Sequence, residues 1–236
     1  MRQRYRFAGG TAVVTGAASG IGAALARALA ARGSHLVLLD SDGEGLAAVA
    51  EATGAASPDV RITTYVVDLA DPAATARTGE TLADAHRDTT LLVNNAGVAL
   101  GGRFDQVSAA QFDAVLAVNL HAVITLTRAL LPVLAAHPGA HLVTLSSIFG
   151  ILAPAGQTAY CTSKFAARNE RTHGRDVSIE RTIVIERRHF RSYGAVRRAY
   201  ASARLDGRTL IDPLASRHDF DRERGFDVLH DARELE

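Results

Sequence analysis

The stretch that decides the fold is Thr11-Ala12-Val13-Val14-Thr15-Gly16-Ala17-Ala18-Ser19-Gly20-Ile21-Gly22. Its first five residues are small or β-branched and predict a short buried strand, and the Ala- and Leu-rich run that continues to Arg32 predicts a helix. A glycine-rich turn between a strand and a helix lets the backbone approach a pyrophosphate, whose charge is favoured at the helix N-terminus. The stretch therefore predicts a nucleotide-binding turn.

The glycine spacing is G-x-x-x-G-x-G, which differs from the G-x-G-x-x-G of the usual dinucleotide fingerprint. Taken alone, the turn also fits a second interpretation, in which the glycines only let a helix pack closely on a sheet. A second strand is expected at 35–39, and it ends in Asp40, about 20 residues beyond the glycines. An acidic residue there can hydrogen-bond the ribose and repel a 2′-phosphate. No Arg or Lys lies in the turn or in Ser41-Asp42, so the sequence favours NAD over NADP. The alternative is an Asp that caps the following helix.

Composition limits the class of protein. The chain has 236 residues, one cysteine and a formal net charge of +1. This length suits a single domain, 1–236, with a substantial core, and one cysteine excludes an intrachain disulfide framework and favours a cytoplasmic location. No basic stripe of the kind that binds nucleic acid is visible in the first two-thirds of the chain, and no run of about 18 apolar residues predicts a membrane span. The basic residues 1–7 lack the apolar stretch of a signal peptide.

Strand and helix signals alternate up to about residue 165. Two helix starts carry their own signals, Asp71-Pro72 as a cap followed by proline and Ser108 with Gln111 as a capping box. The alternation predicts an α/β protein: a single-domain Rossmann fold with a doubly wound parallel sheet and helices on both faces. The expected strands are 11–15, 35–39, 61–67, 90–94 and 141–146, and the expected helices are 20–32, 43–54, 72–87 and 109–136.

Several polar or glycine residues fall at or just past the ends of these strands. Ligands of open α/β sheets bind beyond the carboxyl ends of the strands, so these positions should meet at one edge. Their common place at strand ends is stronger evidence for a ligand site than any single motif. They are Gly16, Asp40, Asp68, Asn94 and Ser147.

A tyrosine and a lysine stand four residues apart, at Tyr160 and Lys164, with Ser147 upstream. On a helix these positions share one face, so the phenol and the ammonium can meet. A nearby cation favours the phenolate and lowers the pKa of the tyrosine toward a useful range, while a serine hydroxyl can hold the oxygen of an alcohol or ketone. The pattern predicts alcohol/ketone redox chemistry; the alternative is a chance pair on a helix surface.

Together these motifs resemble the short-chain dehydrogenase/reductase family of single-domain, nicotinamide-dependent oxidoreductases. The resemblance covers about residues 8–166, roughly two-thirds of the chain. The residues that carry it are Thr15 to Gly22, Asp68-Leu69, Asn94-Asn95-Ala96-Gly97, Asn119, Ser147 and Tyr160-x-x-x-Lys164.

The resemblance implies a role for each matching residue. Ser147, Tyr160 and Lys164 would form the catalytic set, with Asn119 holding a water that links the lysine to solvent; without the resemblance, Asn119 is a solvated polar residue. Asn94 is alternatively a turn former at a strand end. The cofactor-binding positions would be Gly16, Ser19, Gly20, Ile21, Gly22, Asp40, Asp68, Leu69, Asn95, Ala96, Gly97, Tyr160 and Lys164.

The function expected from this resemblance is NAD-dependent interconversion of a secondary alcohol and a ketone by hydride transfer. The near wall of the pocket should include Ile148, Phe149 and Leu152, whose apolar side chains favour a lipophilic substrate. No metal is expected. Family members form homodimers or homotetramers, so the resemblance implies the same assembly for this chain.

The carboxyl-terminal part, 167–236, departs from the family. The stretch after Ala167 lacks an apolar stripe at helical spacing, and no Pro-Gly pair follows the strand expected at 182–185. Three explanations remain open: a diverged substrate-covering region, an arginine-rich interaction or nucleic-acid arm, and a shift of reading frame near residue 167. The alternative function is therefore a catalytically impaired or silent dinucleotide-binding protein.

Overall fold

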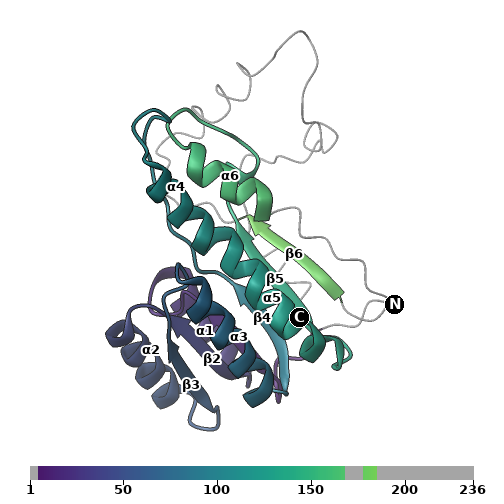
Figure 1. The fold of residues 1–236 in the computed structure, drawn as a ribbon. Helices are drawn as coiled ribbons and strands as arrows, with labels where there is room; N and C mark the ends of the chain where they lie inside the picture. Colours follow the sequence, from purple (N-terminus) through teal and green to yellow (C-terminus); the bar gives the residue numbers. More distant parts are fainter. Residues whose placement is uncertain (1–4, 168–177, 185–236) are drawn as a thin grey trace, which may run out of the picture.

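A parallel sheet forms the centre of the molecule (Figure 1). The computed structural model describes residues 5–167 and 178–184. Within these residues the strands follow the order β3-β2-β1-β4-β5-β6, and every neighbouring pair is parallel. The strands are β1 (Thr11–Thr15), β2 (His35–Asp40), β3 (Ile62–Val66), β4 (Thr89–Asn94), β5 (His141–Ser146) and β6 (Ser178–Val184). The chain reverses its direction across the sheet after β3, so the edge beside β1 and β4 is the switch point at which such sheets bind ligands.

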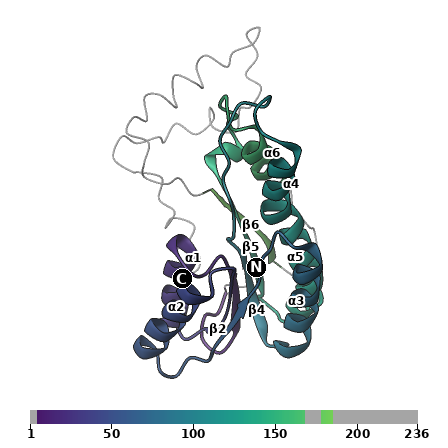
Figure 2. The same ribbon diagram turned by 60° about the vertical axis from the view of Figure 1, so that its left-hand side comes forward.

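Helices cover both faces of this sheet, as the alternating sequence pattern predicts (Figure 2). The helices α1 (Gly20–Ala30) and α2 (Gly43–Ala56) pack on one face, and α3 (Pro72–Ala85) and α5 (Ala122–Ala135) pack on the other. Alternation along β1 divides the core, because Val14 joins the first cluster and Val13 the second. Both side chains are fully buried, and each such burial contributes about 1.5–3 kcal/mol. The expected doubly wound α/β fold is confirmed.

Both predicted helix starts are present. The Asp71 carboxylate accepts hydrogen bonds from the backbone N–H groups of Ala73 and Ala74 at the start of α3. Ser108 and Gln111 bond reciprocally at the start of α4 (Ala109–Leu116). Because each cap satisfies backbone N–H groups that have no partner within the helix, these local sequences fix where the helices begin.

The expected single helix 109–136 is divided in the structure. Between α4 and α5 lies a short π-helical turn, Ala117–His121, in which the N–H of Ala122 bonds to the carbonyl of Ala117. The turn contains Asn119, whose buried side chain bonds to the backbone of Val98 on another segment. Single π-turns of this kind insert one extra residue into an α-helix and are frequent at functional sites. No periodicity in the sequence marks this insertion.

Length and composition alone would let the helical run Ala109–Ala135 cross a membrane. Leu126, Leu130 and Leu134 recur every four residues along it and are buried against the sheet in the same cluster as Leu82 of α3. A stripe at this spacing is typical of a helix that packs on a folded core.

Beyond Ala167, the structure describes one segment, the strand β6 at 178–184. β6 pairs with β5, with Thr182 opposite Thr144. The strand expected at 182–185 is therefore present, and it runs from Ser178 to Val184. The expectations for 168–177 and 185–236, including an unusual region in place of a substrate lid, lie outside the described residues.

Candidate functional site

A cavity of about 910 Å³ opens at the carboxyl edge of the sheet. Loops that follow β1, β2, β3, β4 and β5 line it, together with α6 (Thr158–Ala167). Of the residues predicted from the sequence, the structure brings together Gly16, Ser19, Gly20, Ile21, Asp40, Asp68, Leu69, Asn95, Ala96, Gly97, Ser147, Tyr160 and Lys164. Gly22 and Asn119 lie outside this lining, as do Asn94 and Leu152, which the sequence also placed at the site. Asn94 is instead buried and donates to Thr127 Oγ1 at 3.1 Å.

The glycine turn needs glycine for reasons of space and of backbone conformation. Gly16 has φ +66°, and a Cβ there would lie 2.8 Å from the Cα of Ala96. A Cβ on Gly22 would overlap the carbonyl oxygen of Gly16. Any side chain at either position would therefore separate the turn from helix α1 or from the loop after β4.

A hydrogen-bond network joins this turn to the loop that follows β4. The Asn95 amide donates to the carbonyls of Thr15 and Gly16, at 2.8 and 3.0 Å. In return, the Thr15 hydroxyl oxygen accepts from the backbone N–H groups of Asn95 and Ala96, both at 3.0 Å. The two loops therefore form one rigid floor for the cavity.

The start of α1 fits a pyrophosphate. Ser19 is the N-cap residue of α1, yet its side chain makes no capping hydrogen bond and lines the cavity. The first N–H groups of a helix are unpaired donors that favour negative charge. With glycines at 16, 20 and 22 allowing close approach, the residues present match the phosphate-binding part of a dinucleotide site.

The Asp40 carboxylate lies at the end of β2 and reaches the glycine turn. One oxygen accepts from the N–H of Ala18 at 2.9 Å and the other from the N–H of Asp42 at 3.1 Å. The helix that follows is capped by Asp42, which accepts from Gly45, so the alternative of Asp40 as the helix cap is wrong. Asp40 is half-buried and lines the cavity, where its remaining lone pairs can meet a ribose.

Asp68 and Leu69 follow β3 and form the adjoining wall. The Asp68 carboxylate accepts from the N–H of Ala70 at 2.8 Å and is exposed, while Leu69 is buried. An apolar side chain beside an exposed carboxylate suits a flat ring with hydrogen-bonding edges.

Ser147 and Tyr160 meet at the opposite end of the cavity, from the end of β5 and from α6. Burial raises the pKa of Tyr160, and its hydrogen bond with the Ser147 side chain lowers that pKa in part. The sequence predicts a lowered pKa, but burial is the largest effect here and the pKa is raised. Lys164 Nζ lies over the phenol ring, 5.7 Å from its centroid. The neighbouring Ser146 instead donates to the Lys164 carbonyl at 3.0 Å, which commits that hydroxyl and leaves Ser147 for a ligand.

Lys164 is almost fully buried. Its Nζ donates to the carbonyl of Leu145 at 3.1 Å, and burial lowers the pKa of this ammonium to about 8. A lysine with such a pKa exchanges its proton readily near neutral pH. A Cβ on Gly97 would come within 3.2 Å of this Nζ, so the loop after β4 lies directly against it.

Asn119 joins three segments behind Lys164. Its Oδ1 accepts from the N–H of Val98 at 2.8 Å, and its Nδ2 donates to the Val98 carbonyl at 2.9 Å and to Ser163 Oγ at 2.9 Å. Ser163 in turn donates to the carbonyl of Tyr160 at 2.7 Å. Asn119 is therefore a buried connector, and the sequence-only alternative of a solvated residue is wrong.

Two further residues belong to this region and were not predicted from the sequence. Ser163 carries the connection described above, and Gln157 lines the cavity one helical turn before Tyr160. The signal available for Gln157 was its position three residues before Tyr160, which places both on one side of a helix start.

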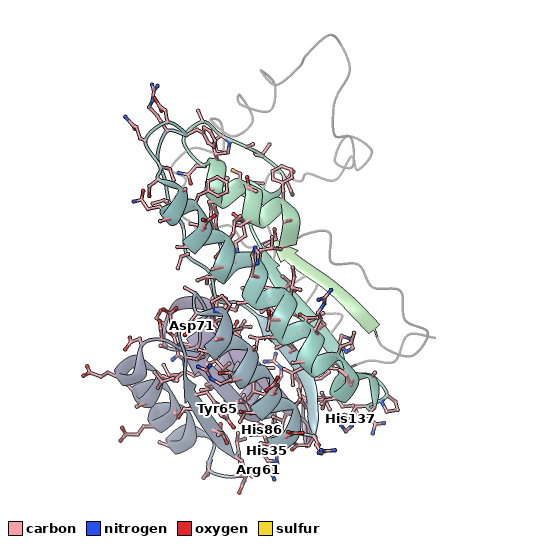
Figure 3. The ribbon with its side chains drawn as sticks, viewed as in Figure 1. His35, Arg61, Tyr65, Asp71, His86 and His137 are labelled. Atoms are coloured by element: carbon pink, nitrogen blue, oxygen red, sulfur yellow. The ribbon has the colours of Figure 1, made fainter. Side chains whose placement is uncertain are left out.

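A second group of titratable side chains lies far from the cavity (Figure 3). His35, Arg61, Tyr65 and His86 gather at the end of the molecule opposite α4 and α6. Within the described residues, no group of three or more His, Cys, Asp or Glu side chains is arranged to hold a metal ion.

Comparison with known proteins agrees with this geometry. A family model described as short chain dehydrogenase matches residues 10–176. The 1-deoxy-11-beta-hydroxypentalenate dehydrogenase of Streptomyces avermitilis is 40% identical over 159 residues, which cover 66% of this chain and 58% of that protein. The chain thus spans 58% of the length of the leading curated relatives.

Solved structures give the same result. A metagenomic short-chain oxidoreductase in complex with NADP matches with a TM-score of 0.64 and 38% identity, over 68% of this chain and 72% of that one. A short chain dehydrogenase/reductase from Burkholderia phymatum in complex with NAD matches with a TM-score of 0.62 and 34% identity, over 69% and 57%. The cavity, its glycine turn and these matches together place the chain in the short-chain dehydrogenase/reductase family.

Proposed function

We propose that the protein is an NAD-dependent oxidoreductase that interconverts a secondary alcohol and a ketone. The observation that carries this proposal is the convergence of Ser147, Tyr160 and Lys164 on the cavity that also holds the glycine turn and Asp40. A hydroxyl that can hold a substrate oxygen, a phenol that can exchange its proton and a buried ammonium are the groups that this reaction needs.

A bound nicotinamide dinucleotide supplies the hydride donor for reduction and the hydride acceptor for oxidation. In reduction, Ser147 donates a hydrogen bond to the ketone oxygen, and the Tyr160 hydroxyl gives that oxygen the proton that completes the alcohol. Lys164 returns a proton toward Tyr160, supported by its pKa of about 8. A water held near Asn119 would connect Lys164 with solvent. In oxidation each proton moves in the opposite direction, and the tyrosine must first be a phenolate.

The raised pKa of Tyr160 bears on direction. A tyrosine that stays protonated at neutral pH is a ready acid but a poor base. We therefore expect ketone reduction to dominate near neutral pH and alcohol oxidation to gain with rising pH.

Asp40 supports NAD over NADP, because a 2′-phosphate would meet its carboxylate and no Arg or Lys lies in the glycine turn or at 41–42. The apolar side chains of Val98, Ala99, Ile148 and Phe149 support a lipophilic substrate. The pentalenate dehydrogenase relative is named for a hydroxylated substrate, which agrees with alcohol chemistry. A cytoplasmic location, a homodimer or homotetramer, and no nucleic-acid partner complete the proposal.

The test is NADH-dependent reduction of a panel of ketones by the purified chain, followed at the absorbance of NADH. Tyr160→Phe should abolish turnover while NADH binding is retained, since the substitution removes only the phenolic hydroxyl that exchanges the proton. NADPH should support at least tenfold slower reduction, of the order that one unfavourable charge contact gives.

The second candidate function is a silent dinucleotide-binding protein, and the abrupt loss of helical pattern after Ala167 favours it. Equal NADH binding by the wild-type chain and Tyr160→Phe, with turnover by neither, would establish this second function. Turnover that survives in Tyr160→Phe would refute the proposed mechanism.

A further inference from the structure

The substrate end of the cavity has one amide side chain in an apolar wall. The lining that contains Ser147 and Tyr160 also contains the apolar side chains of Val98, Ala99, Ile148 and Phe149, and with them the amide of Gln157. Gln157 is half-buried, and its side chain makes no hydrogen bond to another of the residues that the structure describes. An amide has two donor hydrogens and an acceptor oxygen, so this side chain has unused hydrogen-bonding capacity beside the reacting groups.

The backbone around Gln157 is fixed from two sides. Its carbonyl accepts from the N–H of Cys161 at 2.8 Å, so Gln157 stands directly before α6 and is tied to its first turn. On the other side, Gly102 forms a parallel bridge with Gln157 and donates to the carbonyl of Gly156 at 2.8 Å. The side chain is therefore presented from a rigid base and not from a free loop.

Gly101 determines where the amide lies. A Cβ at this position would come within 2.9 Å of Gln157 Nε2, so the amide rests directly against the glycine backbone. Gly101 does not have a positive φ, and an alanine there would meet the amide without straining the main chain. The position of the amide thus depends on the absence of a side chain at residue 101, so Gly101→Ala is a second way to displace it.

From this placement we propose that Gln157 hydrogen-bonds a second oxygen of the substrate. The substrate class is then a ketone or secondary alcohol that carries an additional hydroxyl or ether group on a mainly apolar frame. A partly desolvated amide left unpaired by a plain hydrocarbon ketone disfavours that ketone, because a site built for a hydrogen bond rejects the analogue that lacks it. The inference rests on the proposed function, since it assumes that Ser147 and Tyr160 hold the reacting oxygen.

The experiment compares paired ketones with the full chain and NADH. The pairs are cyclohexanone with 4-hydroxycyclohexanone, and 2-heptanone with 7-hydroxy-2-heptanone. We expect the wild-type chain to prefer the hydroxylated member of at least one pair by roughly five- to tenfold in kcat/KM. Gln157→Leu should remove that preference, because it weakens the hydroxylated substrate and no longer leaves an unpaired amide beside the plain ketone. Gly101→Ala should reduce the preference in the same direction. Gln106→Leu makes the same chemical change on the neighbouring loop outside the cavity lining and should leave the preference intact.

A binding measurement separates this inference from the proposed function. Calorimetric titration of the same ketones into Tyr160→Phe saturated with NADH reports the preference without turnover. A preference that Gln157→Leu removes supports the inference even where the wild-type chain is inactive, in which case only the proposed function fails. Equal preference in the wild-type chain and Gln157→Leu would overturn the inference while turnover still supports the function. A panel that neither binds nor reacts would refute both.

Discussion

At the residue scale, the chemistry depends on which neighbour touches Tyr160. The Ser147 side chain bonds to the phenol and lowers its pKa, whereas Lys164 Nζ points toward the carbonyl of Leu145. Ser146 and Ser147 are adjacent in sequence but have different partners, because the Ser146 hydroxyl donates to the Lys164 carbonyl. One hydroxyl therefore holds the helix and the other faces the cavity.

Ser147→Ala should raise the pKa of Tyr160 further, because burial would then act without the opposing hydrogen bond. The phenolate needed for oxidation would form only at higher pH, so the rising limb of the oxidation rate should move in the alkaline direction. Loss of a group that holds the substrate oxygen should also lower kcat by about 10²-fold. The pH dependence of kcat/KM for alcohol oxidation measures both effects.

Ser146→Ala is the matched control. It removes a hydroxyl from the adjacent residue and should lower thermal stability without moving the alkaline limb. An unchanged pH profile in Ser147→Ala would contradict the assignment of Ser147 as the partner of Tyr160.

At the element scale, a separate polar group of residues joins the end of α3 to strand β3. His86 follows α3, and its Nε2 bonds to the hydroxyl of Tyr65 on β3 at 2.9 Å. Arg61 and Asp88, which form an ion pair at 2.9 Å, also face this histidine. Burial is the largest effect and lowers the pKa of His86, with Asp88 opposing it and Arg61 adding to it.

A histidine whose pKa is lowered on folding makes the protein less stable in acid. Below the ordinary value of about 6.5 the unfolded chain binds the proton first, so stability falls as the pH drops from there through the lowered value in the folded chain. His86→Gln keeps a group that can bond Tyr65 and removes the titration. The urea midpoint of unfolding should therefore decrease less between pH 7.5 and pH 5 for His86→Gln than for the wild-type chain. Equal losses would show that His86 does not carry this dependence.

At the scale of the whole molecule, loops from five strands build one cofactor site. A ligand that binds only the folded chain raises stability by about 2.7 kcal/mol at a hundredfold excess over Kd, which is roughly 5–10 °C in Tm. NADH should give this shift, and NADPH a smaller one because of Asp40. Thermal melts with each nucleotide and with neither are the measurement.

Two glycine variants make this test specific. Gly22→Ala should abolish the NADH shift, because its Cβ would overlap the carbonyl of Gly16. Gly54→Ala, in α2, meets only Ile62 at 3.8 Å and should keep the shift while stabilising the helix by about 0.5–1 kcal/mol. A shift that persists in Gly22→Ala would exclude the glycine turn as the nucleotide site.

Local sequence determined most of the architecture. Alternating strand and helix patterns, the caps at Asp71 and Ser108 and the glycine turn are short-range signals. The structure has them close to where they were expected, except that the helix expected at 109–136 is divided. Their chemistry depends on residues close together in the chain, so periodicity and spacing are enough to locate them.

Tertiary structure alone decided the rest. The π-turn contains Asn119, whose side chain bonds to the backbone of Val98. The amide of Gln157 lies against Gly101, which is 56 positions away in the chain. The raised pKa of Tyr160 follows from burial that no spacing of Tyr and Lys reveals. The sequence by itself determined most of the residues that line the site, because strand ends must share one edge, but it did not point to Gln157. Only packing decided which polar group each of them touches, because those contacts join segments that are distant in the chain.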